Sequence, residues 1–219
     1  MNETHILSVF TDAAGRHGNL LGVVLDTADW ADERCQAEAA RLGHSETVFV
    51  DDADAGRVRI FTPAVRLGFA GHPTVGIGWF LHQLGHPVTA LVTDAGIVEV
   101  SVVGNRCTVV AFPAWSPPWD LIELPSPADV DAAAPGGALR HDYVWAWIDR
   151  GAGVVRARAF ASAVGIAEDE ATGSAAIRLC GSVGRPLLIR QGVGSEIQVA
   201  PRHEGQVALS GSVMLMVTQ

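Results

Sequence analysis

Two short glycine-containing turns, each followed at once by small and apolar residues, constrain the fold of this chain more than any other feature. The first reads Phe69-Ala70-Gly71-His72-Pro73-Thr74, and the second, about half the chain further on, reads Ala171-Thr172-Gly173-Ser174-Ala175. Proline suits the first turn of a helix, because the backbone N–H that it lacks has no partner there. Each turn therefore predicts a helix start, and the apolar residues that follow predict that both helices are buried.

A helix start presents unpaired backbone N–H groups and a partial positive charge, and both favour a bound anion. Two such starts that faced each other would form a small cleft for a carboxylate. The repeated order of strand, glycine turn, buried helix and further strands indicates two similar halves. We therefore expect the cleft to lie between these halves.

The remaining pattern is rich in strands. We expect strands at 6–10, 19–25, 47–50, 57–61, 90–93, 97–102, 108–112, 143–148, 154–160, 187–190, 196–200, 206–209 and 213–217, and helices at 28–42, 74–84, 125–133 and 172–180. Strands and helices do not alternate, which argues against a doubly wound parallel sheet. The pattern favours an α/β (α+β) fold in which sheets curl around the apolar helices. A proline-rich segment at 113–127 is the best linker candidate, so we expect domains at 1–114 and 115–219.

Composition excludes several classes of protein. The chain has 219 residues, of which 48% are hydrophobic, and its net charge is −9. A nucleic-acid surface needs clustered basic residues, so we expect no nucleic acid partner. No apolar run approaches the ~20 residues that span a membrane, and the acidic N-terminus is unlike a signal peptide, so we expect a cytoplasmic protein without a membrane partner.

No motif for a cofactor or metal is present. The three cysteines, Cys35, Cys107 and Cys180, are far apart and indicate neither a disulfide framework nor zinc. Dinucleotide and phosphate-loop fingerprints are missing, and no histidine pair has metal-ligand spacing. We therefore predict no cofactor and no metal. The tryptophans near the middle of the chain fit either core packing or the wall of an aromatic ligand pocket; they are Trp115, Trp119, Trp145 and Trp147.

Glu46 is the first candidate for chemistry, because it stands at the start of an apolar strand. Apolar surroundings disfavour the charged carboxylate and raise its pKa toward neutrality, as a general acid/base requires. A solvated glutamate at a strand edge is the alternative. His72 lies in the first helix-opening turn, where a neutral imidazole could hydrogen-bond at the cleft or could simply cap the helix.

Asp169, Thr172, Gly173 and Ser174 form the third group. Their backbone N–H groups and hydroxyls could bind a substrate, and Asp169 could orient His72 across the cleft. Ordinary helix N-capping is the alternative, since Ser, Thr and Asp are favoured there in any case. A covalent serine mechanism is disfavoured, because no Gly-x-Ser-x-Gly elbow surrounds Ser174.

Together these motifs resemble the PhzF-like family of phenazine-biosynthesis isomerases and their epimerase relatives. The matching stretches are Val9-Phe10-Thr11-Asp12, Gly18-Asn19, Ser45-Glu46-Thr47, Arg59-Ile60-Phe61-Thr62-Pro63, Phe69 to Thr74, Arg158-Ala159-Phe160, Glu168-Asp169, Ala171 to Ala175 and Gln191-Gly192. They cover most of the chain. Two positions depart from the family pattern: Glu170 stands where proline is expected, and Arg66 where an acidic residue is common.

The resemblance implies a diaminopimelate epimerase-like fold of two domains, each a mainly antiparallel sheet around a central helix. It also implies a cofactor-independent isomerase in which Glu46 moves a proton on a small carboxylate, and a homodimer. By the same resemblance, Glu46, His72, Asp169 and Ser174 are the catalytic residues. The expected substrate-binding residues are Gly71, His72, Thr74, Thr172, Gly173, Ser174 and Asn19.

Two other functions remain open at this stage. A relative that binds small carboxylates without turning them over would keep the cleft but would not need Glu46. A serine hydrolase would pair Ser174 with His72. The epimerase relatives use two cysteines as acid and base, and no cysteine falls in either helix-opening turn of this chain.

Overall fold

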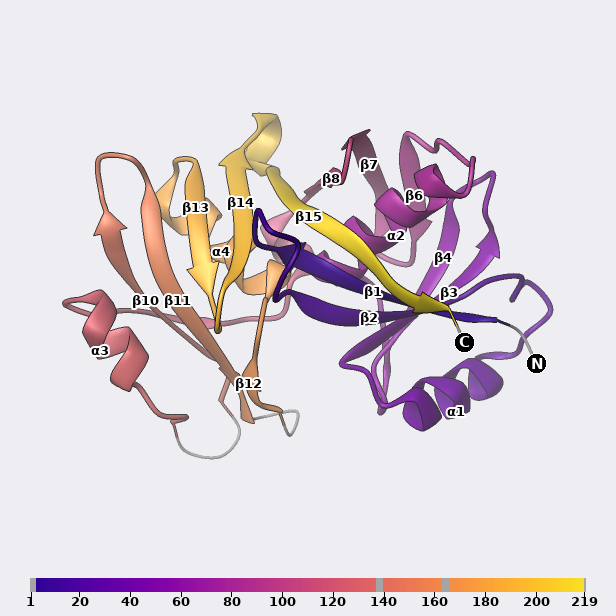
Figure 1. Cartoon of the computed structure of the whole chain (residues 1–219), viewed down its shortest axis with the longest axis horizontal. Coiled ribbons are helices and arrows are strands. Elements are labelled where there is room, and N and C mark those ends of the chain that lie inside the picture. The colour runs from indigo at the N-terminus through magenta and orange to yellow at the C-terminus, as the bar shows by residue number, and fades with distance from the viewer. Residues whose placement is uncertain (1–2, 137–139, 163–165, 219) are drawn as a thin grey trace.

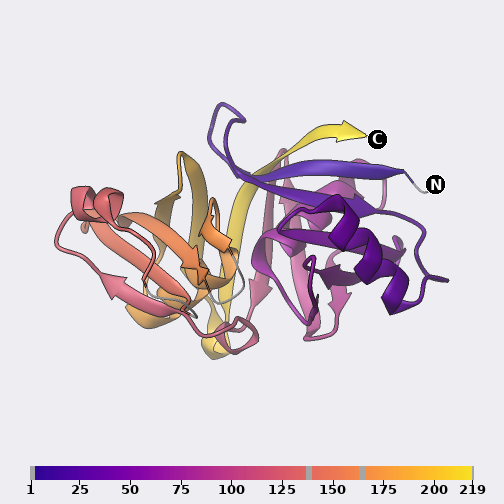
Figure 2. The ribbon, with the colours of Figure 1, turned by 90° about the horizontal axis from the view of Figure 1, so that it is seen from below.

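The computed structural model describes residues 3–136, 140–162 and 166–218. The molecule is elongated and consists of two halves that lie side by side (Figure 1). Each half holds one of the two apolar helices, α2 (Gly71–Gln83) or α4 (Gly173–Val183). Seen from below, strands of both halves meet along the middle of the molecule (Figure 2).

The first half is a closed ring of strands around α2. Its elements are β1 (Thr4–Thr11), β2 (Asn19–Val24), α1 (Asp32–Leu42), β3 (Glu46–Asp52), β4 (Arg57–Phe61), β5 (Arg66–Leu67), β6 (Ala90–Thr93), β7 (Gly96–Val103) and β8 (Arg106–Ala111). The strand order is β1-β2-β3-β4-β6-β7-β8, and β15 (Val207–Thr218) pairs with both β8 and β1 and thereby closes the ring. Helix α2 is buried from Gly71 to Leu81, as expected for an apolar helix inside a barrel.

The second half is an open sheet that packs on α4. It contains η1 (Pro113–Trp115), β9 (Asp120–Glu123), α3 (Pro127–Ala132), β10 (Asp142–Asp149), β11 (Val154–Ala161), β12 (Ile166–Asp169), β13 (Leu187–Gln191), β14 (Ser195–Pro201) and η3 (His203–Gly205). The strand order from the centre outward is β15-β14-β13-β11-β10-β9. Most neighbours are antiparallel, while β11–β13 and β9–β10 are parallel.

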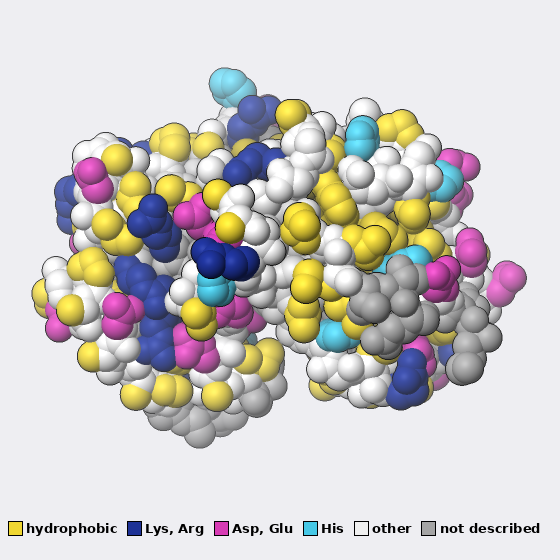
Figure 3. All heavy atoms as spheres, in the orientation of Figure 1, with side chains coloured by type: hydrophobic (Ala, Val, Ile, Leu, Met, Phe, Trp, Pro, Cys, Tyr) yellow, Lys and Arg dark blue, Asp and Glu magenta, His cyan; other side chains and the backbone are white. Residues whose placement is uncertain are grey.

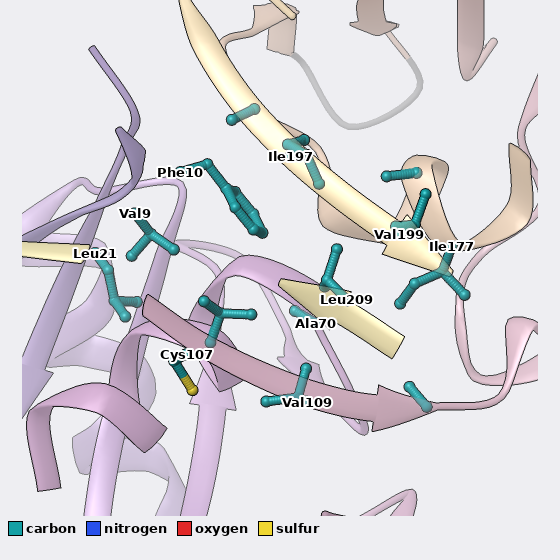
Figure 4. Close-up of a cluster of buried hydrophobic side chains, with 14 of the residues drawn as sticks. Val9, Phe10, Leu21, Ala70, Cys107, Val109, Ile177, Ile197, Val199 and Leu209 are labelled. Carbon is teal, nitrogen blue, oxygen red and sulfur yellow. The ribbon is translucent and has the colours of Figure 1, made fainter. Parts of the chain in front are cut away.

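Strand β15 and a shared core join the two halves. The first part of β15 lies between β14 and β8, and its last part runs beside β1. Figure 4 shows the apolar side chains at this junction, where Phe10 of β1 approaches Ile197 of β14 and Leu209 of β15 lies near Ile177 of α4. One continuous hydrophobic cluster therefore includes residues of both halves.

The predicted fold class, with sheets wrapped around central helices, is confirmed. The segment expected to be a linker contains η1 and β9, and the strands expected at 206–209 and 213–217 form a single strand. The helix expected at 28–42 begins at Asp32. The sequence pattern did not predict the short strands β5 and β12. The division at residues 114 and 115 stays a prediction.

The surface shows no broad basic face in the view of Figure 3, where dark blue and magenta side chains lie intermingled on the second half. The ion pairs of the second half include Arg156–Asp131 and Arg158–Glu168. The same view shows a notch between the lower edges of the two halves. None of the helices in the described ranges is long and apolar enough to cross a lipid bilayer.

Candidate active site

The starts of α2 and α4 face each other at closest approach. A Cβ atom added to Gly71 would lie 2.8 Å from both Cα and the carbonyl carbon of Gly173, and one added to Gly173 would lie 3.0 Å from the backbone nitrogen of His72. Only glycine allows the two helix starts to come so near. The residues before these helices, Ala70 and Thr172, cap no N–H with their side chains. The structure thus brings together the two turns that sequence reasoning paired.

Glu46 lies beside the first of these turns, at the start of β3. Its Oε2 atom lies 3.5 Å from Nδ1 of His72, and the two side chains are 19% and 4% exposed. Burial raises the pKa of the Glu46 carboxyl to about 7, and a hydrogen bond with Ser45 offsets part of that rise. Burial lowers the pKa of His72 to about 4, against the opposing charge of Asp169 and a hydrogen bond to the backbone of Leu20. Both groups are therefore neutral in mildly acid solution.

Asp169 holds the two halves together at the same place. Its Oδ1 atom accepts a hydrogen bond of 2.6 Å from Nδ2 of Asn19 in β2, and its Oδ2 atom accepts one of 2.6 Å from the hydroxyl of Thr172. Burial, and secondly the charge of Glu46, raise the pKa of Asp169 to about 6. Asn19 also accepts a hydrogen bond of 3.3 Å from the Ser45 hydroxyl, so a polar chain runs from β12 to the residue before Glu46.

Gln191 holds Asp169 and Thr172 in place through hydrogen bonds, although sequence reasoning gave it no role of its own. Its Nε2 atom donates to the carbonyl of Asp169 at 2.9 Å and to the Thr172 hydroxyl at 2.8 Å. Its Oε1 atom accepts from the backbone of Thr172 and from the hydroxyl of Tyr143. A fully buried amide must have such partners, since an unpaired polar group in a core is costly. The signals in the sequence were its polar character in an apolar strand and its place in the family-matching stretch Gln191-Gly192.

Ser174 and Thr74 have different surroundings. The Ser174 hydroxyl accepts a hydrogen bond of 3.2 Å from Nε1 of Trp119. The Thr74 hydroxyl is buried and hydrogen-bonds to the carbonyls of Gly71 and of Ala70, the residue before α2. Thr74 therefore stabilises the first turn of α2 through its side chain, while Ser174 lies at the start of α4 beside an aromatic ring.

The four tryptophans have two kinds of surroundings, which correspond to core packing and to the wall of a ligand pocket. Trp145 and Trp147 pack edge to face, and Trp115 packs against Phe69 and Phe112. Trp119 instead lies beside Ser174 and packs against His141 and Tyr143. Trp119 thus has a direct contact with a candidate site residue.

The three cysteines are buried and lie outside both helix-opening turns. Burial raises the pKa of Cys107 to about 12 and that of Cys180 to about 11, so neither is a reactive thiolate near neutral pH. Within residues 3–136, 140–162 and 166–218, no group of three or more His, Cys, Asp or Glu could hold a metal ion.

A protein-family model described as "Phenazine biosynthesis-like protein" matches residues 7–152. The trans-2,3-dihydro-3-hydroxyanthranilate isomerase of Pseudomonas aeruginosa is 31% identical over 82% of this chain and 79% of its own length. Uncharacterized isomerases of Pasteurella multocida and Mesorhizobium japonicum are 39% and 40% identical over 44% and 56% of this chain. The chain spans only 35% and 42% of the length of those two relatives.

Solved structures agree on the fold. A phenazine biosynthesis PhzC/PhzF-type protein from Clostridium difficile superposes with a TM-score of 0.80 at 21% identity, over 100% of this chain and 98% of that one. A hydroxyproline epimerase from Agrobacterium vitis, solved with trans-4-hydroxy-L-proline, superposes with a TM-score of 0.61 at 13% identity, over 100% and 91% of the two chains.

Proposed function

Because the chain belongs to the phenazine biosynthesis-like (PhzC-PhzF) family, we propose that it is an isomerase that moves a proton on a small carboxylate substrate without a cofactor. In this proposal Glu46 is the general acid/base. The observation that carries it is the setting of the Glu46 carboxyl. Its Oε2 atom is buried and has no hydrogen-bond partner among the described residues, while burial raises the pKa of the group to about 7. A base with a pKa near the working pH is the most effective in proton transfer.

The substrate carboxylate would bind at the paired helix starts. The N–H groups of Gly71, His72, Gly173 and Ser174 belong to the first turns of α2 and α4, where backbone donors and helix dipoles favour an anion. No acidic residue occupies the first turn of either helix. The carboxylate would hold a neighbouring C–H bond against Glu46.

The proposed reaction is a balanced proton shift. Glu46 takes a proton from a carbon atom of the substrate, and the electron pair of that C–H bond delocalises toward the substrate's carboxylate or an adjoining double bond. Glu46 then returns the proton to another carbon, so the product is an isomer and the carboxylate of Glu46 is regenerated. Neutral His72, whose Nε2 atom has no hydrogen-bond partner among the described residues, could donate to or accept from the polarised substrate.

Asp169 and Asn19 would orient the substrate from the second side of the cleft. The same proposal includes the homodimer that the family resemblance implies and the cytoplasmic location expected from the sequence. A serine hydrolase is the weaker candidate, since the Ser174 hydroxyl bonds to Trp119 and Nδ1 of His72 lies beside Glu46.

Solvent deuterium tests the proposal. Wild-type protein is incubated in D₂O with trans-2,3-dihydro-3-hydroxyanthranilate, the substrate named for the Pseudomonas relative, and the recovered acids are analysed by NMR. We expect an isomer that carries deuterium at carbon. Glu46→Gln should lower the rate by about 100- to 10,000-fold, because it removes the proton-transfer group. Glu99→Gln, which changes an exposed carboxylate on β7, serves as the control.

Two outcomes would contradict the proposal. Exchange that persists in Glu46→Gln near the wild-type rate would exclude Glu46 as the base. If this acid and a series of other small unsaturated carboxylates acquired no deuterium from the wild-type protein but still bound to it, a non-catalytic carboxylate-binding protein would replace the isomerase.

A further inference from the structure

Glu170 holds the turn between β13 and β14 with its carboxylate. Its two oxygens accept the N–H of Val193 at 3.0 and 2.9 Å, and Oε1 also accepts the N–H of Gly194 at 3.3 Å. A third donor is the hydroxyl of Ser195, which lies 2.8 Å from Oε1. Such a set of converging donors suits an ionised carboxylate, which can only accept.

The turn is shaped to admit this carboxylate. Gly192 has a φ of +59°, and a Cβ atom there would collide with Oε2 and the carbonyl of Glu170. Both the left-handed backbone and the close approach therefore require glycine at this position. Proline, which the family pattern leads us to expect at position 170, has no side-chain acceptor and could make none of these bonds.

Ser195 connects Glu170 to the first half of the molecule. The hydroxyl oxygen of this fully buried residue accepts the backbone N–H of Gly18 at 2.9 Å. Because a backbone N–H can only donate, the hydroxyl proton of Ser195 is left to point at Glu170. The direction of both hydrogen bonds is thus fixed, and Gly18 is tied to Glu170 through one serine.

Hydrogen bonds from two neighbouring residues, Gly18 and Asn19, therefore connect the start of β2 with the 169–171 segment. Gly18 is connected to Glu170 through Ser195, and the next residue, Asn19, donates directly to Asp169 and to the carbonyl of Ala171. Asn19 itself makes these two hydrogen bonds and lies opposite Val9 in the β1–β2 ladder, and the hydrogen bond at Gly18 adds a restraint on its orientation one residue earlier. Asn19 in turn accepts from Ser45, the residue before Glu46.

We propose that Glu170 is a positioning residue, which acts through the 193–195 turn and Ser195 to hold Asn19 against Asp169. Its effect on turnover rests on the proposed function, but its effect on Asn19 does not. Glu170 is not itself placed against the substrate, so the reaction should need it for geometry and not for proton transfer.

The test uses two variants and a matched control. Glu170→Gln keeps the size of the side chain but replaces one acceptor oxygen by a donor that faces N–H groups. Ser195→Ala leaves the bonds from Val193 and Gly194 to Glu170 in place and removes the hydroxyl that connects Glu170 to Gly18. Glu168→Gln is the control, because this carboxylate lies two residues away and bonds to Arg158 at 2.8 and 2.7 Å.

The first measurement needs no substrate. In ¹⁵N-labelled protein, the side-chain amide signals of Asn19 are assigned by their loss in Asn19→Asp, and their chemical shifts and solvent exchange are followed. We expect both Glu170→Gln and Ser195→Ala to move these signals toward those of a solvent-exposed asparagine, and Glu168→Gln to leave them in place. Ser195→Ala decides the question if Glu170→Gln does not fold.

The second measurement is turnover of trans-2,3-dihydro-3-hydroxyanthranilate. We expect kcat to fall by about 10- to 100-fold in both variants with KM changed by less than about 3-fold, as for a small misplacement of catalytic groups. Unchanged Asn19 signals in Ser195→Ala, or an equal change in Glu168→Gln, would overturn the proposal. Shifted Asn19 signals in a protein whose wild type turns nothing over would leave the positioning role standing and count against the proposed function alone.

Discussion

The Oε2 atom of Glu46 and the Nδ1 atom of His72 lie 3.5 Å apart, yet burial drives the pKa values of the two groups in opposite directions, to about 7 and about 4. Between these values the carboxyl is protonated and the imidazole is neutral. Between about pH 4 and pH 7 the pair is therefore a contact between uncharged groups and not an ion pair. This relationship explains how both side chains tolerate burial, and it makes the site sensitive to pH.

Glu46→Gln should change the pH dependence of stability. The unfolded chain releases the Glu46 proton near pH 4.5, whereas the folded protein keeps it until about pH 7. The folded state thus binds more protons in this window, so the contribution of Glu46 to stability is fully present below pH 4.5 and is lost as the pH rises to 7. Glutamine does not titrate, so its variant has no such loss. Between pH 4.5 and 7.5 the free energy of unfolding of Glu46→Gln should therefore rise by about 3 kcal/mol relative to that of wild type.

Urea unfolding at several pH values measures this difference. His72 contributes with the opposite sign, since its lowered pKa makes its contribution fall as the pH drops from 6.5 to 4, but it is common to both proteins and cancels in the comparison. Glu99→Gln is the control and should show no such trend. If the difference in free energy of unfolding between Glu46→Gln and wild type stayed constant with pH, Glu46 would not be desolvated.

Isomerase activity should rise with pH. A general base must be ionised in the free enzyme, so kcat/KM should increase along a limb whose midpoint lies near pH 7, the pKa of Glu46. Asp169, with a pKa raised to about 6, titrates just below this limb. Asp169→Asn should therefore lower the midpoint, because it removes a neighbouring negative charge that disfavours ionised Glu46. A midpoint that stayed the same, or rose, in Asp169→Asn would contradict the coupling of these two carboxyls.

Local sequence patterns predicted the helices that form this site better than the long-range hydrogen bonds that connect its residues. The glycines and the apolar runs after them predicted both buried helices, because helix starts and burial depend on neighbouring residues. The role of Gln191, the tie from Gly18 to Ser195 and the contact of Trp119 with Ser174 join positions far apart in the chain. Such contacts depend on the sheet register and on β15 joining both halves, which no local pattern contains.

The contact between the helix starts should make Gly71→Ala strongly destabilising. The added Cβ atom would lie 2.8 Å from the backbone of Gly173, so the two helices must separate. We expect a loss of about 1–3 kcal/mol, as for overpacking in a core. Gly68→Ala is the matched control, since its Cβ atom would meet the backbone nitrogen of Ala95 at 3.7 Å, an ordinary van der Waals distance. Chemical denaturation measures both variants, and equal stability would mean that the helix starts are not in tight contact.

Ser174 should not react as a nucleophile. Its hydroxyl accepts a hydrogen bond from Trp119, and Nδ1 of His72 lies 3.5 Å from Oε2 of Glu46. A serine-directed fluorophosphonate should therefore leave Ser174 unlabelled, as read by mass spectrometry of the digested protein. Label on Ser174 that disappeared in Ser174→Ala and in His72→Asn would instead support the serine hydrolase.

Small carboxylates should stabilise the protein through the paired helix starts. A ligand that binds only the folded state adds about 2.7 kcal/mol at a hundred times its Kd, which raises Tm by several degrees for a chain of this size. Anthranilate should therefore raise Tm, while anthranilamide, which has the same ring and no charge, should raise it much less. Gly71→Ala should weaken the response, because the helix starts separate. An equal rise with the acid and the amide would show that the ring, and not the carboxylate, is recognised.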